Sequence, residues 1–228
     1  METKFLISFI IGILNIFLGI VIYNKNRQSL NNIFYGLMCF AGGMWGIFMS
    51  FLWITKDENL VNNFVVRGMY LFAILAPLFY LLFAYNFPLK SFIYSRKVLN
   101  FIVAIPIILI ILILTSVLTM ESITFSGDSV NSEFIASNFI FFVIYFFAYI
   151  IWGLAILLKK VGKDVFRSHK KAITYLIIGT ISTFFLTGIV SVIMPLLGNS
   201  QYDWLGPIFL LVHFVVVGYL IFFEFRKY

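Results

Sequence analysis

Residues 67–88 of the chain read RGMYLFAILAPLFYLLFAYNFP. The run contains about 20 mostly apolar residues, which is the length that a helix needs to cross a hydrocarbon core about 30 Å thick. An arginine stands at one end, Pro77 lies near the middle, and tyrosines are interspersed. Proline removes a backbone hydrogen bond and kinks a helix. The stretch therefore predicts a kinked membrane-spanning helix over 67–87.

The composition of the whole chain agrees with a membrane environment. Hydrophobic residues make up 62% and charged residues 11% of the 228 residues, against roughly 45–50% and about 25% in soluble domains. The formal net charge of +7 comes from short loops between apolar runs. It does not form a basic patch on a fold of its own, so nucleic-acid binding is not predicted.

Seven apolar runs account for nearly the whole chain. They are too long for the strands of a membrane barrel, so we predict one all-α domain over 1–228, a polytopic bundle of seven transmembrane helices. The expected spans are 5–23, 32–54, 67–87, 98–119, 134–158, 172–197 and 204–223. The opening METK has no basic n-region, so the first run is expected to be retained and not cleaved as a signal peptide.

The loops predict an orientation. Thirteen of the 16 Lys and Arg residues lie on one side of the predicted bundle, and seven of the nine acidic residues lie on the other. Basic loops stay in the cytoplasm, so the N-terminus is expected outside and the C-terminus inside. On the outer side, residues 121–134 read ESITFSGDSVNSEF. They predict either a hairpin over the outer mouth of the bundle or a disordered acidic loop.

The span over 67–87 carries the first candidate site residues. Helical spacing places Arg67, Tyr70, Ile74, Pro77 and Leu81 on one face. One interpretation puts Arg67 at the mouth of an outward-facing pocket, with Tyr70 below it and Pro77 as the hinge of a movable helix. The other makes Arg67 a side chain that reaches the headgroups and the kink a matter of packing.

His213 lies near the centre of the seventh span, and an ionisable residue at that depth indicates a functional site. The alternative is a neutral imidazole that shares a hydrogen bond with a hydroxyl of the sixth span. That span carries hydroxyls at helical spacing, and they could equally bond to carbonyls of their own helix: Thr180, Thr183, Thr187 and Ser191. No second ligand lies at this depth, so no metal site is predicted.

The second span combines small residues with a deep tryptophan. Gly42, Gly43 and Gly46 allow another helix to approach closely, either within the bundle or in a homodimer. Trp45 lies deep enough to line a pocket, although core packing is the commoner role of such a ring. Trp204, at the start of the seventh span, is the last candidate for the pocket.

The sequence lacks the motifs that mark several classes of membrane protein and enzyme. The spans carry no carboxylate at their centres, and the chain has no HExxH, GxSxG or P-loop sequence, so no enzyme activity and no cofactor are predicted. The single cysteine, Cys39, permits neither an intrachain disulfide nor a cysteine-based metal site.

The order of features resembles a known family. The relevant stretches are LGIVIYNKNR at 18–27, NNIFYGLMCFAGGMWGIFMSFLW at 31–53, the run over 67–88, and WLGPIFLLVHFVVVGYLIFFEFRKY at 204–228. Together they resemble the N-terminal seven-transmembrane sensor region of bacterial histidine kinases. The most specific points are the Arg-x-x-Tyr start of the third span with Pro77, the Gly206-Pro207 pair and the basic exit at 226–227.

The resemblance implies a sensor in the bacterial inner (plasma) membrane. In that family the seventh helix continues into a cytoplasmic output with a phosphoacceptor and an ATP-binding domain. This sequence stops at Tyr228, about where the output would begin, so the sensor architecture is implied and the kinase activity is not.

We therefore expect a sensor that binds a small, partly apolar ligand from outside or from the membrane. It would signal in trans to a cytoplasmic protein through 159–171 and 224–228. Two alternatives remain at this point: a membrane accessory or assembly subunit that uses the Gly42–Gly46 stripe, and a small-solute permease.

Overall fold

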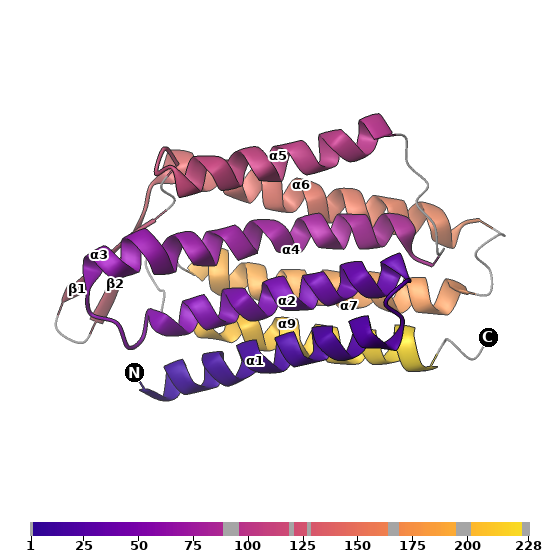
Figure 1. Cartoon of the computed structure of the whole chain (residues 1–228), viewed down its shortest axis with the longest axis horizontal. Coiled ribbons are helices and arrows are strands. Elements are labelled where there is room, and N and C mark those ends of the chain that lie inside the picture. Colours follow the sequence, from indigo (N-terminus) through magenta and orange to yellow (C-terminus); the bar gives the residue numbers. More distant parts are fainter. Residues whose placement is uncertain are drawn as a thin grey trace.

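The structure, a computed structural model, describes residues 2–88, 96–118, 121–126, 129–163, 169–194 and 202–224. Seven of its helices are long and apolar enough to cross a membrane, and they lie side by side in one bundle (Figure 1). Their regular parts are α1 (Glu2–Lys25), α2 (Leu30–Phe51), α4 (Val66–Asn86), α5 (Arg96–Leu114), α6 (Ala136–Val161), α7 (Lys170–Gly188) and α9 (Gly206–Tyr219). The predicted bundle of seven helices is confirmed.

The third membrane helix is longer than the predicted span. The short helix α3 (Glu58–Leu60) and a π-helical turn, η1 (Val61–Val65), run without a break into α4. Asp57 begins this helix because its carboxylate accepts hydrogen bonds from the backbone N–H groups of Asn59 (3.0 Å) and Leu60 (3.1 Å). Arg67 consequently lies in the third turn of a continuous helix.

A β-hairpin covers one end of the bundle. Strand β1 (Glu121–Ser126) pairs antiparallel with β2 (Ser129–Phe134), so the hairpin interpretation of this loop is confirmed. The Asn62 side chain of η1 holds β1 by both of its polar atoms. Its Nδ2 donates to the Ile123 carbonyl at 2.9 Å, and its Oδ1 accepts from the Ile123 N–H at 2.7 Å. We call this the hairpin end, and the opposite end, where α9 finishes, the tail end (Figure 1).

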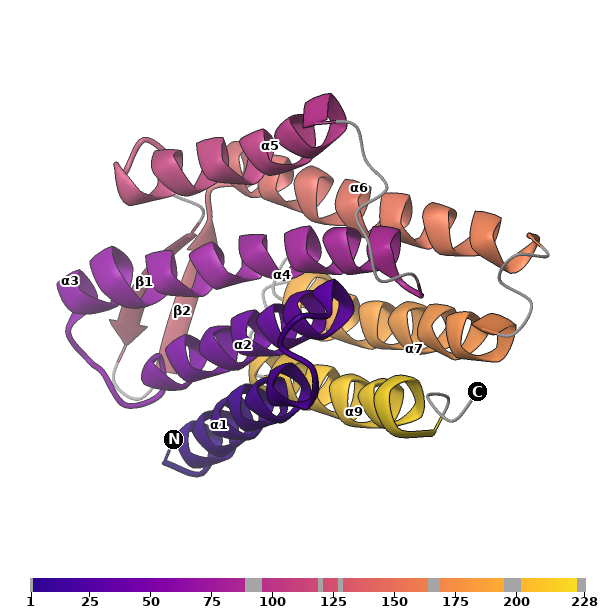
Figure 2. The same ribbon diagram turned by 45° about the vertical axis from the view of Figure 1, so that its right-hand side comes forward.

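The first two helices are in backbone contact. A Cβ atom added at Gly43 would lie 2.6 Å from the Gly12 carbonyl oxygen, and one added at Gly19 would lie 2.7 Å from that of Gly36. Only glycine permits such an approach in a membrane bundle. The helices α2 and α4 are the most buried of the seven and α5 is the least, in agreement with the position of α5 at the edge of the bundle (Figure 2).

Two tyrosines of α6 donate hydrogen bonds to backbone carbonyls close to prolines of the neighbouring helices. Pro106 in α5 has no N–H to donate to the Ile102 carbonyl, and the Tyr149 hydroxyl donates to that carbonyl at 2.7 Å. One turn earlier, the Tyr145 hydroxyl donates at 2.7 Å to the carbonyl of Ile74, next to the carbonyl that Pro77 leaves free. In lipid, carbonyls left without a helical donor need such a partner.

Two lysines hold helix ends at the tail end. Nζ of Lys160, on α6, donates to the carbonyls of Ala84, Tyr85 and Phe87 at 2.5–2.8 Å and so caps the end of α4. Nζ of Lys25, on α1, donates to the Phe222 carbonyl in η5 (Leu220–Glu224), the π-helical continuation of α9. A cation at a helix C-terminus is stabilised by the unpaired carbonyls and by the helix dipole.

Candidate ligand-binding cavity

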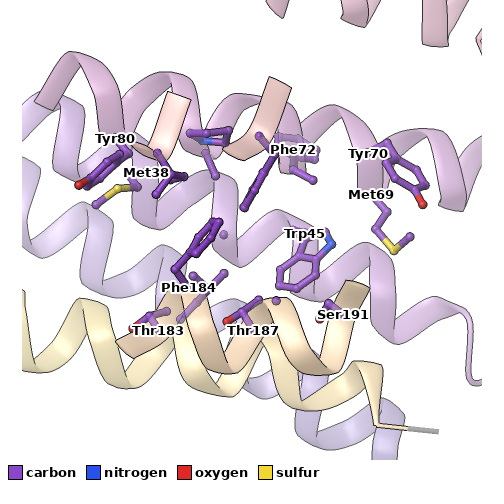
Figure 3. A pocket seen from close by; sticks show the side chains of 18 of the residues that line it. Met38, Trp45, Met69, Tyr70, Phe72, Tyr80, Thr183, Phe184, Thr187 and Ser191 are labelled. Atoms are coloured by element: carbon purple, nitrogen blue, oxygen red, sulfur yellow. The ribbon is translucent and has the colours of Figure 1, made fainter. Parts of the chain in front are cut away.

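A cavity of about 160 Å³ lies between the helices, in the half of the bundle nearer the hairpin end. Its walls come from α2, α4, α6, α7, α9 and the π-helical turn η3 (Ile189–Ile193) that extends α7. Apolar side chains make up most of the lining, among them Met38, Trp45, Phe72, Phe142 and Phe184. Figure 3 shows hydroxyl-bearing residues of α7 and η3 along one side and the aromatic rings and methionines of α2 and α4 opposite.

One face of α4 contributes several of the lining residues. Met69, Ala73, Ala76 and Tyr80 follow one another at spacings of four and three residues, which is the repeat of one helix face. The alanines leave the space that larger side chains would fill. Pro77 lies between them in sequence and also lines the cavity, so the predicted hinge is part of the wall.

Several buried polar atoms of the lining make no hydrogen bond. They are the hydroxyls of Tyr80, Thr180, Thr187 and Ser191 and Nδ1 of His213. The two hydroxyls of Tyr80 and Thr180 lie near one another, but outside hydrogen-bond geometry. Each unpaired buried group costs about 1–3 kcal/mol. The proposed bonds from Thr180, Thr187 and Ser191 back to their own helix are not made, so these groups remain available to an occupant.

Glycines on facing helices fix the positions of the polar side chains. A Cβ at Gly179 of α7 would lie 3.0 Å from Nδ1 of His213, and one at Gly153 of α6 would lie 2.4 Å from Cε1 of Tyr80. At the start of α9, a Cβ at Gly206 would lie 2.5 Å from the Ser191 hydroxyl oxygen and 2.6 Å from the indole ring of Trp45. Because the rings pack directly on backbone, neither Tyr80 nor His213 has room to turn toward these glycines.

The structure brings together three of the five predicted pocket residues. Trp45, Tyr70 and His213 line the cavity. Arg67 does not line it, and donates instead to the side-chain oxygen of Asn63 at 2.7 Å. Trp204 lies in a short 3₁₀ turn, η4 (Asp203–Leu205), and is also absent from the lining.

The glycines of α2 pack inside the bundle. A Cβ at Gly42 would lie 2.9 Å from the Phe214 ring of α9, and one at Gly46 would lie 3.2 Å from Pro207. Gly43 faces α1, as described above. Each of these contacts is made within one chain.

Tyr80 is the main cavity residue that the sequence did not indicate. The predicted face of the third span was defined by Arg67 and therefore passed through Leu81 in place of Tyr80. A signal was present, because Ala73 and Ala76 are small residues near the middle of the span, and small side chains at helical spacing mark the face next to an empty volume or a close helix.

Two other predictions, on a metal site and on the signalling surface, can be compared with the described residues only. Within them, no group of three or more His, Cys, Asp and Glu side chains could hold a metal ion. The expected signalling surface at 159–171 and 224–228 falls partly outside, since residues 164–168 and 225–228 are not described.

The fold places the chain among multi-pass membrane proteins with seven candidate spans. A family model for the N-terminal 7TM region of histidine kinase matches residues 7–226. The chain therefore belongs to this family and is a sensor-type membrane region, as the resemblance implied. A comparison with curated proteins finds no match.

Proposed function

We propose that this chain senses a small, mostly apolar molecule that binds in the cavity, and that occupancy changes the packing of helix ends at the tail end. The observation that carries the proposal is the cavity itself, with unpaired polar groups from α4, α7 and α9 in its wall. A ligand that satisfies these groups favours the bundle packing in which it binds, and so shifts the population of states.

The charge distribution supports an inner-membrane orientation with the tail end in the cytoplasm. The described basic residues of the tail end lie in or beside the ends of α1, α5, α6 and α7: Lys25, Arg27, Arg96, Lys97, Lys159, Lys160, Lys163, Lys170 and Lys171. The positive-inside rule then directs the cavity half of the bundle to the outer side.

Two of the helices that line the cavity run to lysine contacts at the tail end. α4 carries Tyr80 in the cavity wall and ends six residues later at Asn86, where Lys160 binds the carbonyls of Ala84, Tyr85 and Phe87. α9 carries His213 in the wall, and its continuation η5 is held by Lys25. A shift of either helix therefore changes a lysine contact, and a partner protein at 159–171 and 224–228 would respond to that change.

Neither alternative function gains support from an observation. The assembly alternative depended on the Gly42–Gly46 stripe, whose contacts lie within one bundle. The permease alternative has no carboxylate at the centre of a span to support it.

A covalent occupant tests the coupling without knowledge of the ligand. We would replace Cys39 by Ala, introduce Ala76→Cys in the cavity wall, and modify it with butyl methanethiosulfonate. We expect the butyl group to change amide hydrogen exchange around Lys25 and Lys160. It would occupy the cavity, and α4 and α9 line that cavity and end at these two lysines.

The matched control is Ala148→Cys, modified in the same way, since Ala148 is exposed on α6. It should leave exchange at the tail end unchanged. Complete modification at position 76 with no change at the tail end would show that the cavity does not communicate with that end, and would contradict the proposed function.

A further inference from the structure

The deep end of the cavity is formed by three polar side chains from three helices. Tyr80 of α4 is 3% exposed, Thr180 of α7 is 6% exposed and His213 of α9 is 7% exposed. The Tyr80 and Thr180 hydroxyls and the His213 Nδ1 atom have no hydrogen-bond partner. Tyr80 packs on the backbone of Gly153 through a ring carbon and not through its hydroxyl, whereas His213 lies against Gly179 with Nδ1 and Cε1.

This cluster selects the chemistry of the head of the ligand. Two hydroxyls and an imidazole both donate and accept hydrogen bonds, which suits an alcohol, a ketone or an amide. None of the residues that line the cavity is Asp, Glu, Lys or Arg. A carboxylate or an ammonium would therefore lose its hydration with no opposite charge to replace it.

The remaining wall selects the body. Towards the hairpin end the cavity is bounded by Trp45, Phe142 and Leu210, which offer dispersion contacts, and the hydroxyls of Thr187 and Ser191 lie along one side of it (Figure 3). The volume of about 160 Å³ is close to that of an engineered cavity of about 150 Å³ that binds benzene. A body of roughly six to ten non-hydrogen atoms fits such a volume.

We infer that the cavity binds an uncharged, largely apolar molecule whose hydrogen-bonding head lies between Tyr80, Thr180 and His213 and whose body extends towards Trp45. This inference rests on the proposed function, because it names the class of ligand for the same site. The ligand enters from the bilayer or from the outer aqueous phase. Its head group decides binding, whichever phase it comes from.

Trp45 provides a direct readout, because it is the tryptophan that lines the cavity. The chain has four tryptophans, so the variant Trp53→Phe, Trp152→Phe, Trp204→Phe leaves Trp45 as the single fluorophore. In phosphatidylcholine nanodiscs we would titrate 6-bromohexan-1-ol, 1-bromohexane and 6-bromohexanoate, whose bromine atoms quench a nearby indole. Quenching by a probe bound in the cavity saturates as the probe concentration rises. Quenching by probe molecules in the bilayer keeps increasing with their concentration.

We expect 6-bromohexan-1-ol to quench Trp45 saturably and to bind at least about tenfold more tightly than bromohexane or bromohexanoate. Bromohexane lacks one buried hydrogen bond, and bromohexanoate would have to bury its charge. The isosteric pair Tyr80→Phe and Thr180→Val should lower the affinity for the alcohol about tenfold, to the level of bromohexane. Tyr219→Phe, on the exposed face of α9, should leave it unchanged.

Three results would overturn the inference: equal affinity for the alcohol and the bromoalkane, tighter binding of the carboxylate, or no saturable quenching of Trp45 by any probe. If the tryptophan variant does not fold, thermal unfolding of the unmodified chain with hexan-1-ol, hexane and hexanoate must give the same order. These results are independent of the butyl tether at position 76, which tests communication with the tail end regardless of the head group.

Discussion

At the scale of single residues, the tyrosines of α6 show how a membrane bundle accommodates proline. Tyr149 reaches the carbonyl that Pro106 leaves without a donor, and Tyr145 reaches the carbonyl of Ile74 beside the break made by Pro77. At Ile102 a hydroxyl from a neighbouring helix thus replaces a missing backbone N–H, and both proline-containing helices are bonded to α6.

The bond from Tyr149 gives a prediction at this scale. Tyr149→Phe should lower the free energy of unfolding by about 1 kcal/mol, within the range for hydrogen bonds between membrane helices. The measurement is reversible unfolding in mixed micelles by SDS titration. In a Pro106→Ala background the Ile102 carbonyl regains a helical donor, so the same substitution should cost clearly less. An equal cost in both backgrounds would mean that the tyrosine acts by packing alone.

At the scale of helices and strands, glycine decides how close the elements lie. The contacts between α1 and α2 bring backbone against backbone at Gly12 and Gly43. Gly12 and Gly19 are seven residues apart in α1, as are Gly36 and Gly43 in α2. This spacing is two turns of helix, so the sequence contained a signal for the pairing of the first two spans.

Gly43→Ala tests that pairing. The new methyl group would meet the carbonyl oxygen of Gly12 at 2.6 Å, and backbone cannot move aside as a side chain can. We expect a loss of about 1–3 kcal/mol in unfolding free energy, as for other overpacked positions. Gly162→Ala is the control, because a Cβ there has open space around it. Equal stability of the two variants would show that α1 and α2 separate without cost.

At the scale of the whole molecule, the two ends of the bundle carry different features. The hairpin end carries the cavity and a hairpin held by Asn62. The tail end carries the basic residues and the lysine contacts at the ends of the third and seventh membrane helices. The helices α4 and α9, which end at these lysine contacts, contribute Tyr80 and His213 to the cavity.

Lys160→Met provides the test at the scale of the molecule. The substitution leaves three carbonyls at the end of α4 without the ammonium and separates α6 from α4 at the tail end. We expect a loss of about 2 kcal/mol in unfolding free energy, together with faster amide exchange near Asn86. The neighbouring Lys159 is exposed, so Lys159→Met should change neither. If both variants behave alike, Lys160 does not hold α4.

The sequence alone determined the solvent, the number of helices and their order, because each follows from lengths of apolar runs that must match the bilayer. It also indicated Trp45, Tyr70 and His213 as residues of a pocket, because an indole, a phenol or an imidazole within the membrane has a polar group that needs a partner. The hairpin was one of two open interpretations, because its short strands pair with each other and are held by Asn62, which lies about 60 residues away in sequence.

Only the tertiary structure decided which face of each helix borders the cavity. Arg67 suggested a face of the third span, but the orientation of that helix follows from what its neighbours pack against, and Tyr80 lines the cavity in place of Leu81. The glycines of α2 could serve a contact inside the bundle or a homodimer, and within the chain they contact α1 and α9. In lipid every helix surface is apolar, so hydrophobicity does not distinguish the inward face from the outward one, and the close fit of side chains against backbone does.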